Sequence, residues 1–435
     1  MRKIIALILL FATCLVGCNM VNEINVEEPG KNTKPQGPNI VEYGAASAET
    51  QLSNTFKLLC SGEKKLTIGY LGGSITSGST AAQIVAKQKG DIALSYVNRV
   101  SNWFKEEYPD ATIETVNAGV SDTATNYGIF RLETTLMNEK GHDMPDLVFV
   151  EYTSNDWFYD TQSKDEVLIQ IESLIRNIWD KNPYAEIVFL STQVAFKSDS
   201  VKAYKEIAEK YNIPFIDVGT PLRRAKKEKC GNIDESSGTY YYTTDNLHPS
   251  AAGFQVYFDT IKPALEEMLT FDVKDWKLYD YRANLSTPYY KNLITNPQIV
   301  TVDSLTFSGD AVVAAKPISV SMYDTMVLGT KSIKIVENCI DVTGKTTITG
   351  KFSGSTLGFL FEIKGGKKSF KLRYQIDGGE WKELGVNSKS WAFQMYSHSQ
   401  VFMLSHDLGD GGHTVNIEFD DDSQTFFGGL LVNSK

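Results

Sequence analysis

The chain has 435 residues, a length that favours two domains over one. Apolar residues make up 42% of it and charged residues 22%, which allows sizeable folded cores and excludes wholesale disorder. The formal net charge of −10 argues against a nucleic-acid-binding protein, which normally carries a basic patch or stripe.

Residues 1–17 have the pattern of an export signal: two basic residues, a short apolar run and small residues before Cys18. The segment Leu15-Val16-Gly17-Cys18 resembles the lipobox of bacterial lipoproteins, which implies cleavage before Cys18 and attachment of a lipid to it. An ordinary signal peptide and an uncleaved membrane anchor are the alternatives, although the run is short for a full span. We expect a lipoprotein of the bacterial cell envelope that faces the periplasm or the cell surface. Its tether to the membrane would be residues 18–45, which are polar and contain three prolines.

Removal of the signal and lipidation of Cys18 would leave three cysteines, which are Cys60, Cys230 and Cys339. An odd and widely spaced set is neither a disulfide framework nor a set with metal-ligand spacing. Free buried thiols are favoured, with a single disulfide pair as the alternative. We expect no metal ion and no cofactor.

Residues 46–272 alternate between short apolar runs and segments with helical spacing. The runs expected to form strands are 66–71, 112–117, 146–152, 186–191 and 214–218. The segments expected to form helices are 92–108, a stretch through 131–137, 167–179, 202–211 and 251–269. Pro263 is expected to kink or break the last helix. Strands that alternate with helices predict an α/β domain with a parallel sheet covered on both faces.

The helical period disappears after about residue 272, and residues 273–435 are expected to form a second domain. Runs of β-like composition, separated by glycine and aspartate turns, lie at 305–309, 345–352, 357–363, 369–381, 401–406 and 413–419. The pattern predicts an all-β sandwich of jelly-roll type. Trp381 and Trp391 are candidates for stacking on sugars, with core or interface packing as the commoner alternative.

The stretch from Gly72 to Gly78, GGSITSG, is the first candidate site because dense glycines allow a sharp turn or a close approach to a ligand. Its glycine spacing matches a phosphate-binding P-loop, but Ser79 stands where the lysine for the phosphates is required. Nucleotide binding is therefore disfavoured. The other chemistry of such a turn is a nucleophilic serine, which needs a neighbouring base because a hydroxyl is a weak nucleophile.

His248 is the best candidate for that base among the five histidines. It lies in the sequence TDNLHPS, just before the last predicted helix of the α/β domain. Asp245 precedes it by three residues, close enough in a tight turn for its carboxylate to hold the imidazole Nδ1–H. The remaining histidines are interpreted as ordinary polar residues: His142 in a hydrophilic loop, and His398, His406 and His413 in the β-rich segment.

Four blocks of the sequence, taken in order, resemble those of the SGNH (GDSL-type) hydrolases. They are Gly72-Gly73-Ser74-Ile75-Thr76, Asn117-Ala118-Gly119, Thr153-Ser154-Asn155-Asp156 and Asp245-Asn246-Leu247-His248-Pro249. Each block is weak alone, but each lies near the end of a predicted strand or before the last helix, in the order of the family. The resemblance covers residues 65–270 and implies a three-layer α/β/α fold with strand order 2-1-3-4-5.

The resemblance also implies a role for each matched position. Ser74 would be the nucleophile, His248 the general base and then the acid, and Asp245 the group that orients the imidazole. The backbone N–H groups of Ser74 and Gly119 and the side-chain amide of Asn155 would form the oxyanion hole. Such preorganised donors stabilise the negative charge that grows during acyl transfer. The alternative for Ser74 is that it only caps the following helix.

Two positions depart from the family pattern, since Gly73 stands where aspartate is usual and Thr153 stands where glycine is usual. We expect altered turn geometry at these positions rather than lost chemistry. Arg131 and Tyr242 are candidate substrate contacts. A helix-surface salt bridge is the alternative for Arg131, and strand or core packing is the alternative for Tyr242.

The GGSIT form of the first block and the stretch LVFVEYTSND are similar to a branch of bacterial carbohydrate esterases. The β-rich segment resembles jelly-roll modules that accompany some of these enzymes. The resemblance implies a metal-free serine esterase that removes O-acetyl groups from a polysaccharide or oligosaccharide. The alternatives are a lipase or lysophospholipase of the same superfamily, and a non-catalytic glycan-binding lipoprotein.

Overall fold

The computed structural model describes residues 52–434, except for residues 61, 79–93, 138–142, 159–162, 193–197, 229–232, 235–238, 244–246, 271–274, 325–328, 365–368 and 387–397. The expected export signal and the tether lie outside the described residues, and so does Cys18. Asp245, Cys230 and Trp391 also lie outside them.

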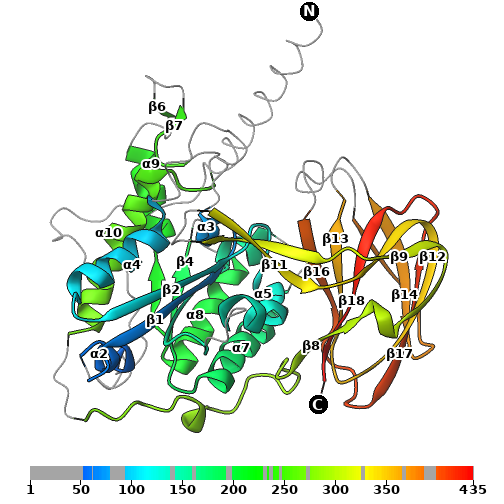
Figure 1. Ribbon diagram of the computed structural model, residues 1–435, viewed down its shortest axis with the longest axis horizontal. Helices are drawn as coiled ribbons and strands as arrows, with labels where there is room; N and C mark the ends of the chain where they lie inside the picture. Colours follow the sequence, from blue (N-terminus) through cyan, green and yellow to red (C-terminus); the bar gives the residue numbers. More distant parts are fainter. Residues whose placement is uncertain are drawn as a thin grey trace, which may run out of the picture. The chain divides into compact units, whose positions relative to one another are not determined.

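The described part of the α/β domain is built on a five-stranded parallel sheet (Figure 1). Its strands are β1 (Lys65–Gly72), β2 (Thr112–Gly119), β3 (Leu147–Glu151), β4 (Glu186–Ser191) and β5 (Phe215–Asp217). The spatial order is β2-β1-β3-β4-β5, as the resemblance to the SGNH hydrolases implied. Every residue of β3 and β4 is buried, as expected for parallel strands covered on both faces.

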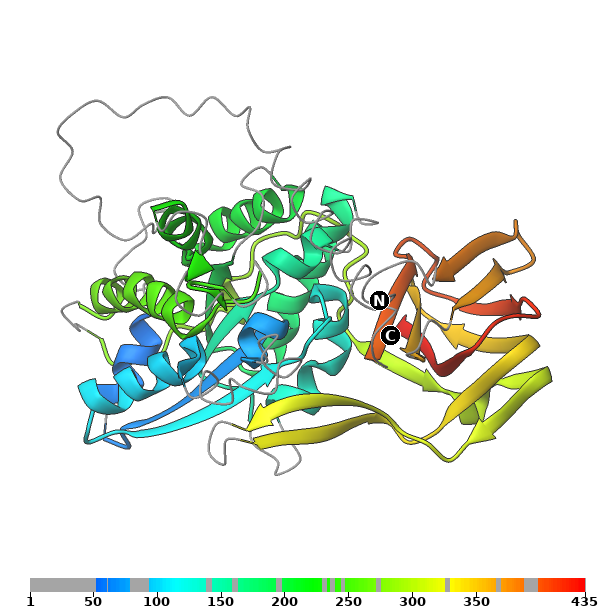
Figure 2. The same cartoon turned by 90° about the horizontal axis from the view of Figure 1, so that it is seen from above.

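Helices cover both faces of this sheet, which Figure 2 shows from above. On β4, Val188 and Leu190 belong to the apolar cluster that contains helices α4 (Tyr96–Glu107) and α10 (Ala251–Met268). Ile187 and Phe189 belong to the cluster that contains helices α7 (Lys164–Lys181) and α8 (Asp199–Tyr211). The helices are α2 (Ser53–Cys60), α3 (Ser74–Ser77), α4 (Tyr96–Glu107), α5 (Thr125–Leu132), α6 (Thr153–Phe158), α7 (Lys164–Lys181), α8 (Asp199–Tyr211), α9 (Gly219–Glu228) and α10 (Ala251–Met268). A short hairpin of β6 (Ile233–Asp234) and β7 (Thr239–Tyr240) follows α9.

Two helical segments differ from the sequence expectation. Pro263 does not break α10, which continues through it. The proline lacks an N–H and so removes one helical hydrogen bond, but the neighbouring Ile261 and Leu265 are fully buried, and their packing outweighs that loss. The predicted helical stretch through 131–137 is the end of α5 followed by a π-helical turn, Glu133–Met137.

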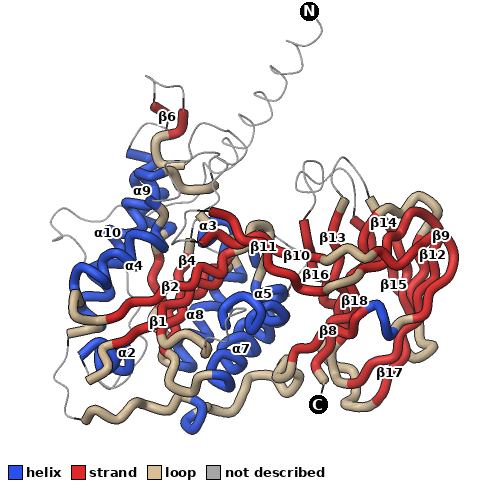
Figure 3. The backbone as a smooth tube through the Cα atoms, viewed as in Figure 1, coloured by secondary structure: helices blue, strands red, loops and turns tan. Residues whose placement is uncertain are grey.

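The second domain is antiparallel, all-β and sandwich-like (Figure 3), which confirms the predicted fold class. Its described strands are β8 (Pro297–Thr301), β9 (Thr306–Ala314), β10 (Ile318–Asp324), β11 (Gly329–Val336), β12 (Cys339–Ser353), β13 (Leu357–Ile363), β14 (Phe370–Ile376), β15 (Lys382–Val386), β16 (His398–Ser405), β17 (Gly412–Phe419) and β18 (Thr425–Asn433). Nine of these strands pair in one sheet, whereas β10 and β11 form a separate hairpin. The long strand β12 alternates between buried and exposed positions, so one of its faces packs on the core.

One apolar cluster is continuous across the two domains, and the described residues of both domains belong to one compact unit. The cluster contains Val120 from the α/β domain and Val401 from β16. The β10–β11 hairpin lies beside β2. The segment between the domains follows the α/β domain, where the N–H of Ile294 donates to Ser173 Oγ at 2.9 Å. The two domains are therefore packed against each other rather than joined by a free linker.

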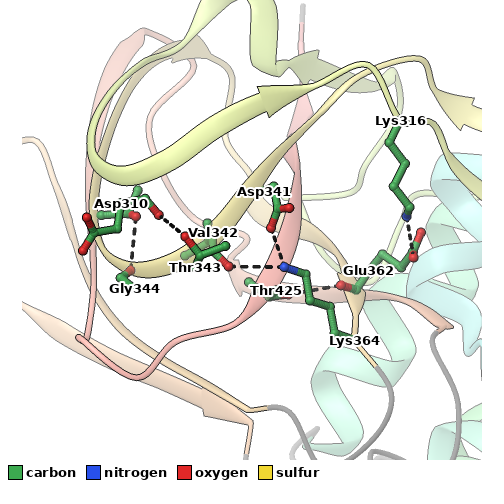
Figure 4. Close-up of polar contacts among 10 residues, drawn as sticks. Asp310, Lys316, Asp341, Val342, Thr343, Gly344, Glu362, Lys364 and Thr425 are labelled. Carbon is green, nitrogen blue, oxygen red and sulfur yellow. Dashed lines mark hydrogen bonds and ion pairs between the residues drawn. The ribbon is translucent and has the colours of Figure 1, made fainter.

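Paired charges fix the base of the β10–β11 hairpin. The ammonium of Lys316, just before β10, lies 2.6 Å from a carboxylate oxygen of Glu362 in β13, and Lys364 pairs with Asp341 (Figure 4). Both ammonium groups also lie over the ring of Phe426, at 4.0 and 4.2 Å from its centroid. The Lys316–Glu362 pair holds the segment between β9 and β10 against β13, and the Lys364–Asp341 pair joins the end of β13 to β12.

Cys60 and Cys339 are free thiols, the first exposed and the second buried. The expectation of buried free thiols therefore holds for Cys339 and is wrong for Cys60. Within the described residues, no helix has the length and apolar character needed to cross a membrane. In that same part of the chain, no group of three or more His, Cys, Asp or Glu side chains is arranged to hold a metal ion.

Candidate active site

Ser74 lies at the carboxyl end of β1, where the chain turns from strand into helix. Strand β1 ends at Gly72, Gly73 occupies the N-cap position of α3, and Ser74 is the first residue of that helix. The Oγ atom of Ser74 lies 2.7 Å from Nε2 of His248, a residue 174 positions later in the chain. The structure therefore brings the predicted nucleophile and base together, and it does not use the Ser74 side chain as the helix cap.

His248 is held by the end of the loop that precedes α10. Thr243 and Pro249 form an isolated antiparallel bridge that closes this loop. Ser250 follows as the N-cap of α10, so His248 stands two residues before the N-cap of a long helix. Asp245 lies outside the described residues, and its role in orienting the imidazole stays a prediction.

Tyr242 packs as part of the α/β core. Its ring makes an edge-on contact with Tyr241, at 4.7 Å between centroids, and it lies against the cluster that contains α4 and α10. Its carbonyl accepts the N–H of Ser250 at 3.0 Å. These contacts fit the core-packing alternative for Tyr242, whereas the neighbouring Tyr241 is 40% exposed.

The amide of Asn155 lies against the backbone of Gly73. A Cβ atom added to Gly73 would lie 2.5 Å from Oδ1 of Asn155 and 2.9 Å from Nδ2, well inside van der Waals contact. Asn155 belongs to α6, the helix that follows β3, so its amide and the Ser74 turn meet at the same edge of the sheet. The structure therefore explains why position 73 is glycine: Asn155 fills the space that a side chain would need.

Gly119, at the end of β2, is also held in a position without room for a side chain. A Cβ atom there would lie 2.2 Å from the backbone nitrogen of Ser77 in α3. The N–H of Gly119 donates to Oδ1 of Asn117 at 3.0 Å. Its predicted part in an oxyanion hole stays a prediction, but the need for glycine follows from the close approach of two backbones.

Arg131 does not contact substrate, contrary to the sequence expectation, because its side chain is fully buried. Nη1 donates to the carbonyl of Ala118 at 2.7 Å, and Nη2 donates to the carbonyl of Gly72 at 3.1 Å. Its hydrogen-bond acceptors among the described residues are carbonyl and hydroxyl oxygens, so the helix-surface salt bridge is also wrong. Arg131 ties together the ends of β1 and β2, which lead into Ser74 and Gly119.

Residues 70–256 match the GDSL-like Lipase/Acylhydrolase family. The matched range contains the Ser74 turn, Asn155 and His248 and excludes the β domain. This part of the chain is therefore GDSL-like in its sequence. Among curated proteins, none matches the sequence of the chain.

Solved structures resemble either most of this chain or about half of it. The crystal structure of a two-domain esterase (CEX) active on acetylated mannans has a TM-score of 0.65 and 18% identity, and covers 89% of this chain and 95% of its own. The same esterase co-crystallised with mannopentaose has a TM-score of 0.64 and 17% identity, and covers 91% of this chain and 97% of its own. Axe2, an acetylxylan esterase from Geobacillus stearothermophilus, has a TM-score of 0.35 and 19% identity, and covers 48% of this chain and 95% of its own.

Beneath Ser74 the GDSL-like domain contains a buried carboxyl group that the sequence interpretation missed. Glu151, at the end of β3, accepts hydrogen bonds from Oγ1 of Thr76 at 2.9 Å and from Oγ1 of Thr192 at 2.6 Å. Burial raises the pKa of Glu151 to about 7, and the hydrogen bonds from the two threonines oppose that rise. The carboxyl group thus connects α3, which carries Ser74, to the end of β4. The available signal was a glutamate that ends an otherwise apolar strand, LVFVE.

Helix α6 of the GDSL-like domain, which carries Asn155, is fixed from two sides. Asp156 accepts from the N–H and Oγ1 of Thr125 in α5, at 2.9 and 2.6 Å. Burial raises the pKa of Asp156 to about 6. The hydroxyl of Thr153 accepts the N–H of Thr192 at 3.1 Å, so the threonine that replaces the usual glycine anchors α6 to the end of β4.

Replacing Gly73 by alanine is expected to lower the turnover number of the GDSL-like domain by about 10²-fold. The added methyl group would displace the Asn155 amide, which is the predicted oxyanion donor, and loss of one such donor typically costs ~10²–10³ in kcat. The measurement is kcat for p-nitrophenyl acetate. Gly62→Ala is the matched control, because a Cβ atom at Gly62 meets nothing within 4 Å. Equal kcat for Gly73→Ala and Gly62→Ala would mean that the contact between Gly73 and Asn155 does not matter for catalysis.

Proposed function

We propose that the chain is a serine esterase that removes O-acetyl groups from a polysaccharide or oligosaccharide through an acyl-enzyme on Ser74. The observation that carries this proposal is the 2.7 Å contact between Ser74 Oγ and His248 Nε2 at the end of β1. A hydroxyl held against an imidazole by two separately anchored elements is the arrangement that nucleophilic catalysis requires.

In the first half-reaction, Nε2 of His248 takes the proton of Ser74 while Oγ attacks the carbonyl carbon of the ester. Negative charge develops on the carbonyl oxygen, and donors that are already fixed stabilise it without reorganisation. The Asn155 amide and the N–H of Ser74 are the proposed donors. The tetrahedral intermediate collapses when the imidazolium gives its proton to the sugar oxygen, which leaves as a hydroxyl group.

In the second half-reaction, a water molecule gives a proton to His248 and its oxygen attacks the carbonyl carbon of acetyl-Ser74. A second tetrahedral intermediate forms, and the same donors stabilise its charge. The imidazolium then returns the proton to Ser74 Oγ as acetate leaves. The cycle ends with the hydroxyl and the neutral imidazole in their starting states.

Acetylated mannan is the first substrate to test. The solved structure that covers 89% of this chain is that of a two-domain esterase active on acetylated mannans. At 18% identity this likeness supports a class of acetylated glycan rather than an individual one. Acetylated xylan and acetylated bacterial glycans therefore belong in the same panel.

The experiment measures acetate release from this panel, together with hydrolysis of p-nitrophenyl esters from acetate to palmitate, by the wild-type chain and by Ser74→Ala. We expect a preference for acetate and loss of at least ~10³-fold in Ser74→Ala. Full activity of Ser74→Ala would overturn the proposal. A preference for long acyl chains would favour a lipase instead, and glycan binding without acetate release would favour a binding protein.

A further inference from the structure

The loop between β2 and α5, residues 120–124, contains a residue in the left-handed conformation. Asp122 has a φ of +58°, a region that residues other than glycine seldom adopt. The loop begins directly after Gly119 and ends next to Thr125, which is bonded to Asp156. A left-handed residue beside an active site persists only where surrounding contacts hold it.

Gln400 of the β domain supplies such a contact. Its Nε2 donates to the carbonyl of Asp122 at 2.7 Å, across 278 residues of sequence. Gln400 is only 6% exposed. Because little water reaches this place, a lost donor would not be readily replaced by solvent.

Gln400 stands on a rigid support. It lies in β16 and pairs with Phe361 of β13 in the antiparallel ladder, and Phe361 is fully buried. The next residue, Val401, belongs to the same apolar cluster as Val120, the first residue of the loop. The position of the Gln400 amide is therefore set by the β sheet and by the packing between the two domains.

The α/β domain fastens the same loop at other residues. The hydroxyl of Thr123 donates to the carbonyl of Val120 at 2.8 Å, and Nη2 of Arg131 donates to the Thr123 hydroxyl at 3.3 Å. Gln400, from the other domain, adds a hydrogen bond at Asp122, the left-handed residue itself. The loop is thus held from both domains.

We propose that Gln400 is a positioning residue: through its bond to Asp122, the β domain holds loop 120–124 in the conformation that the active site uses. The proposal rests on the esterase function proposed above. It gives the β domain a part in turnover that is separate from glycan binding.

The test compares Gln400→Glu with Gln375→Glu. A glutamate has the same shape, but its ionised carboxylate cannot donate to a carbonyl. Gln375 is the matched control, because its Nε2 also donates to a backbone carbonyl, that of Gly379, at 2.7 Å, beside the left-handed Asp377. Gln400→Glu is expected to lower kcat for p-nitrophenyl acetate about 10- to 10²-fold with little change in KM, as for a small misplacement of catalytic groups. Gln375→Glu is expected to leave both constants unchanged.

A second substitution separates positioning from general destabilisation. Glycine adopts the left-handed conformation without steric cost, so Asp122→Gly should reduce the loop's dependence on the Gln400 bond. In the Gln400→Glu background, Asp122→Gly is expected to restore part of the lost kcat. A variant that is merely less stable would gain nothing from this change.

Hydrogen exchange of the backbone amides in loop 120–124 reports the conformation of the loop without any activity. Exchange is expected to be faster in Gln400→Glu than in Gln375→Glu within this loop. Unchanged exchange together with unchanged kcat would overturn the proposal. A wild-type chain without esterase activity would overturn the proposed function alone, because exchange would still show whether Gln400 holds the loop.

Discussion

Replacing His248 by alanine is expected to lower kcat for p-nitrophenyl acetate by about 10³-fold, because Ser74 then loses the proposed base for its proton. KM should change little, since the imidazole acts on the hydroxyl rather than on the bound ester. Initial rates of p-nitrophenolate release over a range of substrate concentrations separate the two constants. Added imidazole should restore part of the rate in His248→Ala, because a free base can enter the space left by the side chain.

His413 provides the matched control for this experiment. Its Nδ1 lies 2.6 Å from Oδ2 of Asp377, and its Nε2 lies 2.7 Å from the carbonyl of Gly409. It is therefore a histidine paired with a carboxylate, as predicted for His248, but its second nitrogen contacts a carbonyl in place of a hydroxyl. His413→Ala is expected to retain the wild-type kcat. If His248→Ala retains it equally well, the contact with Ser74 is not the catalytic centre.

The α/β domain could be predicted closely because its strands and helices carry distinct periods. Strand β4 was expected at residues 186–191, and the structure has it there, with every residue buried. Ser74 and His248 could be paired across 174 residues because both family blocks stand at one edge of the predicted sheet. In open α/β sheets this carboxyl edge is where functional side chains converge.

The β domain was predicted less completely, because a glycine inside a strand cannot be distinguished by sequence from a glycine in a turn. The segment TFFGGLLVN was not predicted, yet it is strand β18. Gly429 has a φ of +137°, and the ladder between β13 and β18 shifts register at this point. A Cβ atom on Gly428 would lie 2.6 Å from the Ile318 side chain. Both glycines thus serve a bulge and a close approach inside a strand, which sequence alone does not distinguish from a turn.

The charged residues beneath the site were not predicted, for a different reason. Charged side chains are usually exposed, so the sequence interpretation placed Arg131 at the substrate or on a helix surface and did not single out Glu151. Both are fully buried in the structure. Where β1, β2 and β3 end, polar groups of the backbone and of threonines need partners, and these two side chains provide them. No spacing pattern in the sequence predicts these hydrogen bonds of Arg131 and Glu151.

Replacing Arg131 by methionine is expected to lower the free energy of unfolding by about 3 kcal/mol, since buried oxygens that lose a donor each cost roughly 1–3 kcal/mol. The affected oxygens include the carbonyl of Ala118 and the hydroxyl of Tyr152, to which Nη2 donates at 2.5 Å. Arg131→Lys should be intermediate, because an ammonium keeps the charge but cannot span two strand ends as a guanidinium does. Urea unfolding of each variant measures the loss. The kcat of the folded fraction should also fall, because the ends of β1 and β2 set the Ser74 turn.

Replacing Arg176 by methionine is the control that distinguishes this effect on the Ser74 turn from the general loss of stability on removing an arginine. Its Nε and Nη2 donate to the hydroxyl of Tyr211 at 3.0 and 2.6 Å, its guanidinium lies over the Tyr211 ring, and Nη2 also bonds the carbonyl of Ser286. The chemistry resembles that of Arg131, but it joins α7 to the segment between the domains. Arg176→Met is therefore expected to lower stability while leaving the kcat of the folded protein unchanged. A folded Arg131→Met protein with wild-type kcat would mean that β1 and β2 keep Ser74 in place without the buried guanidinium.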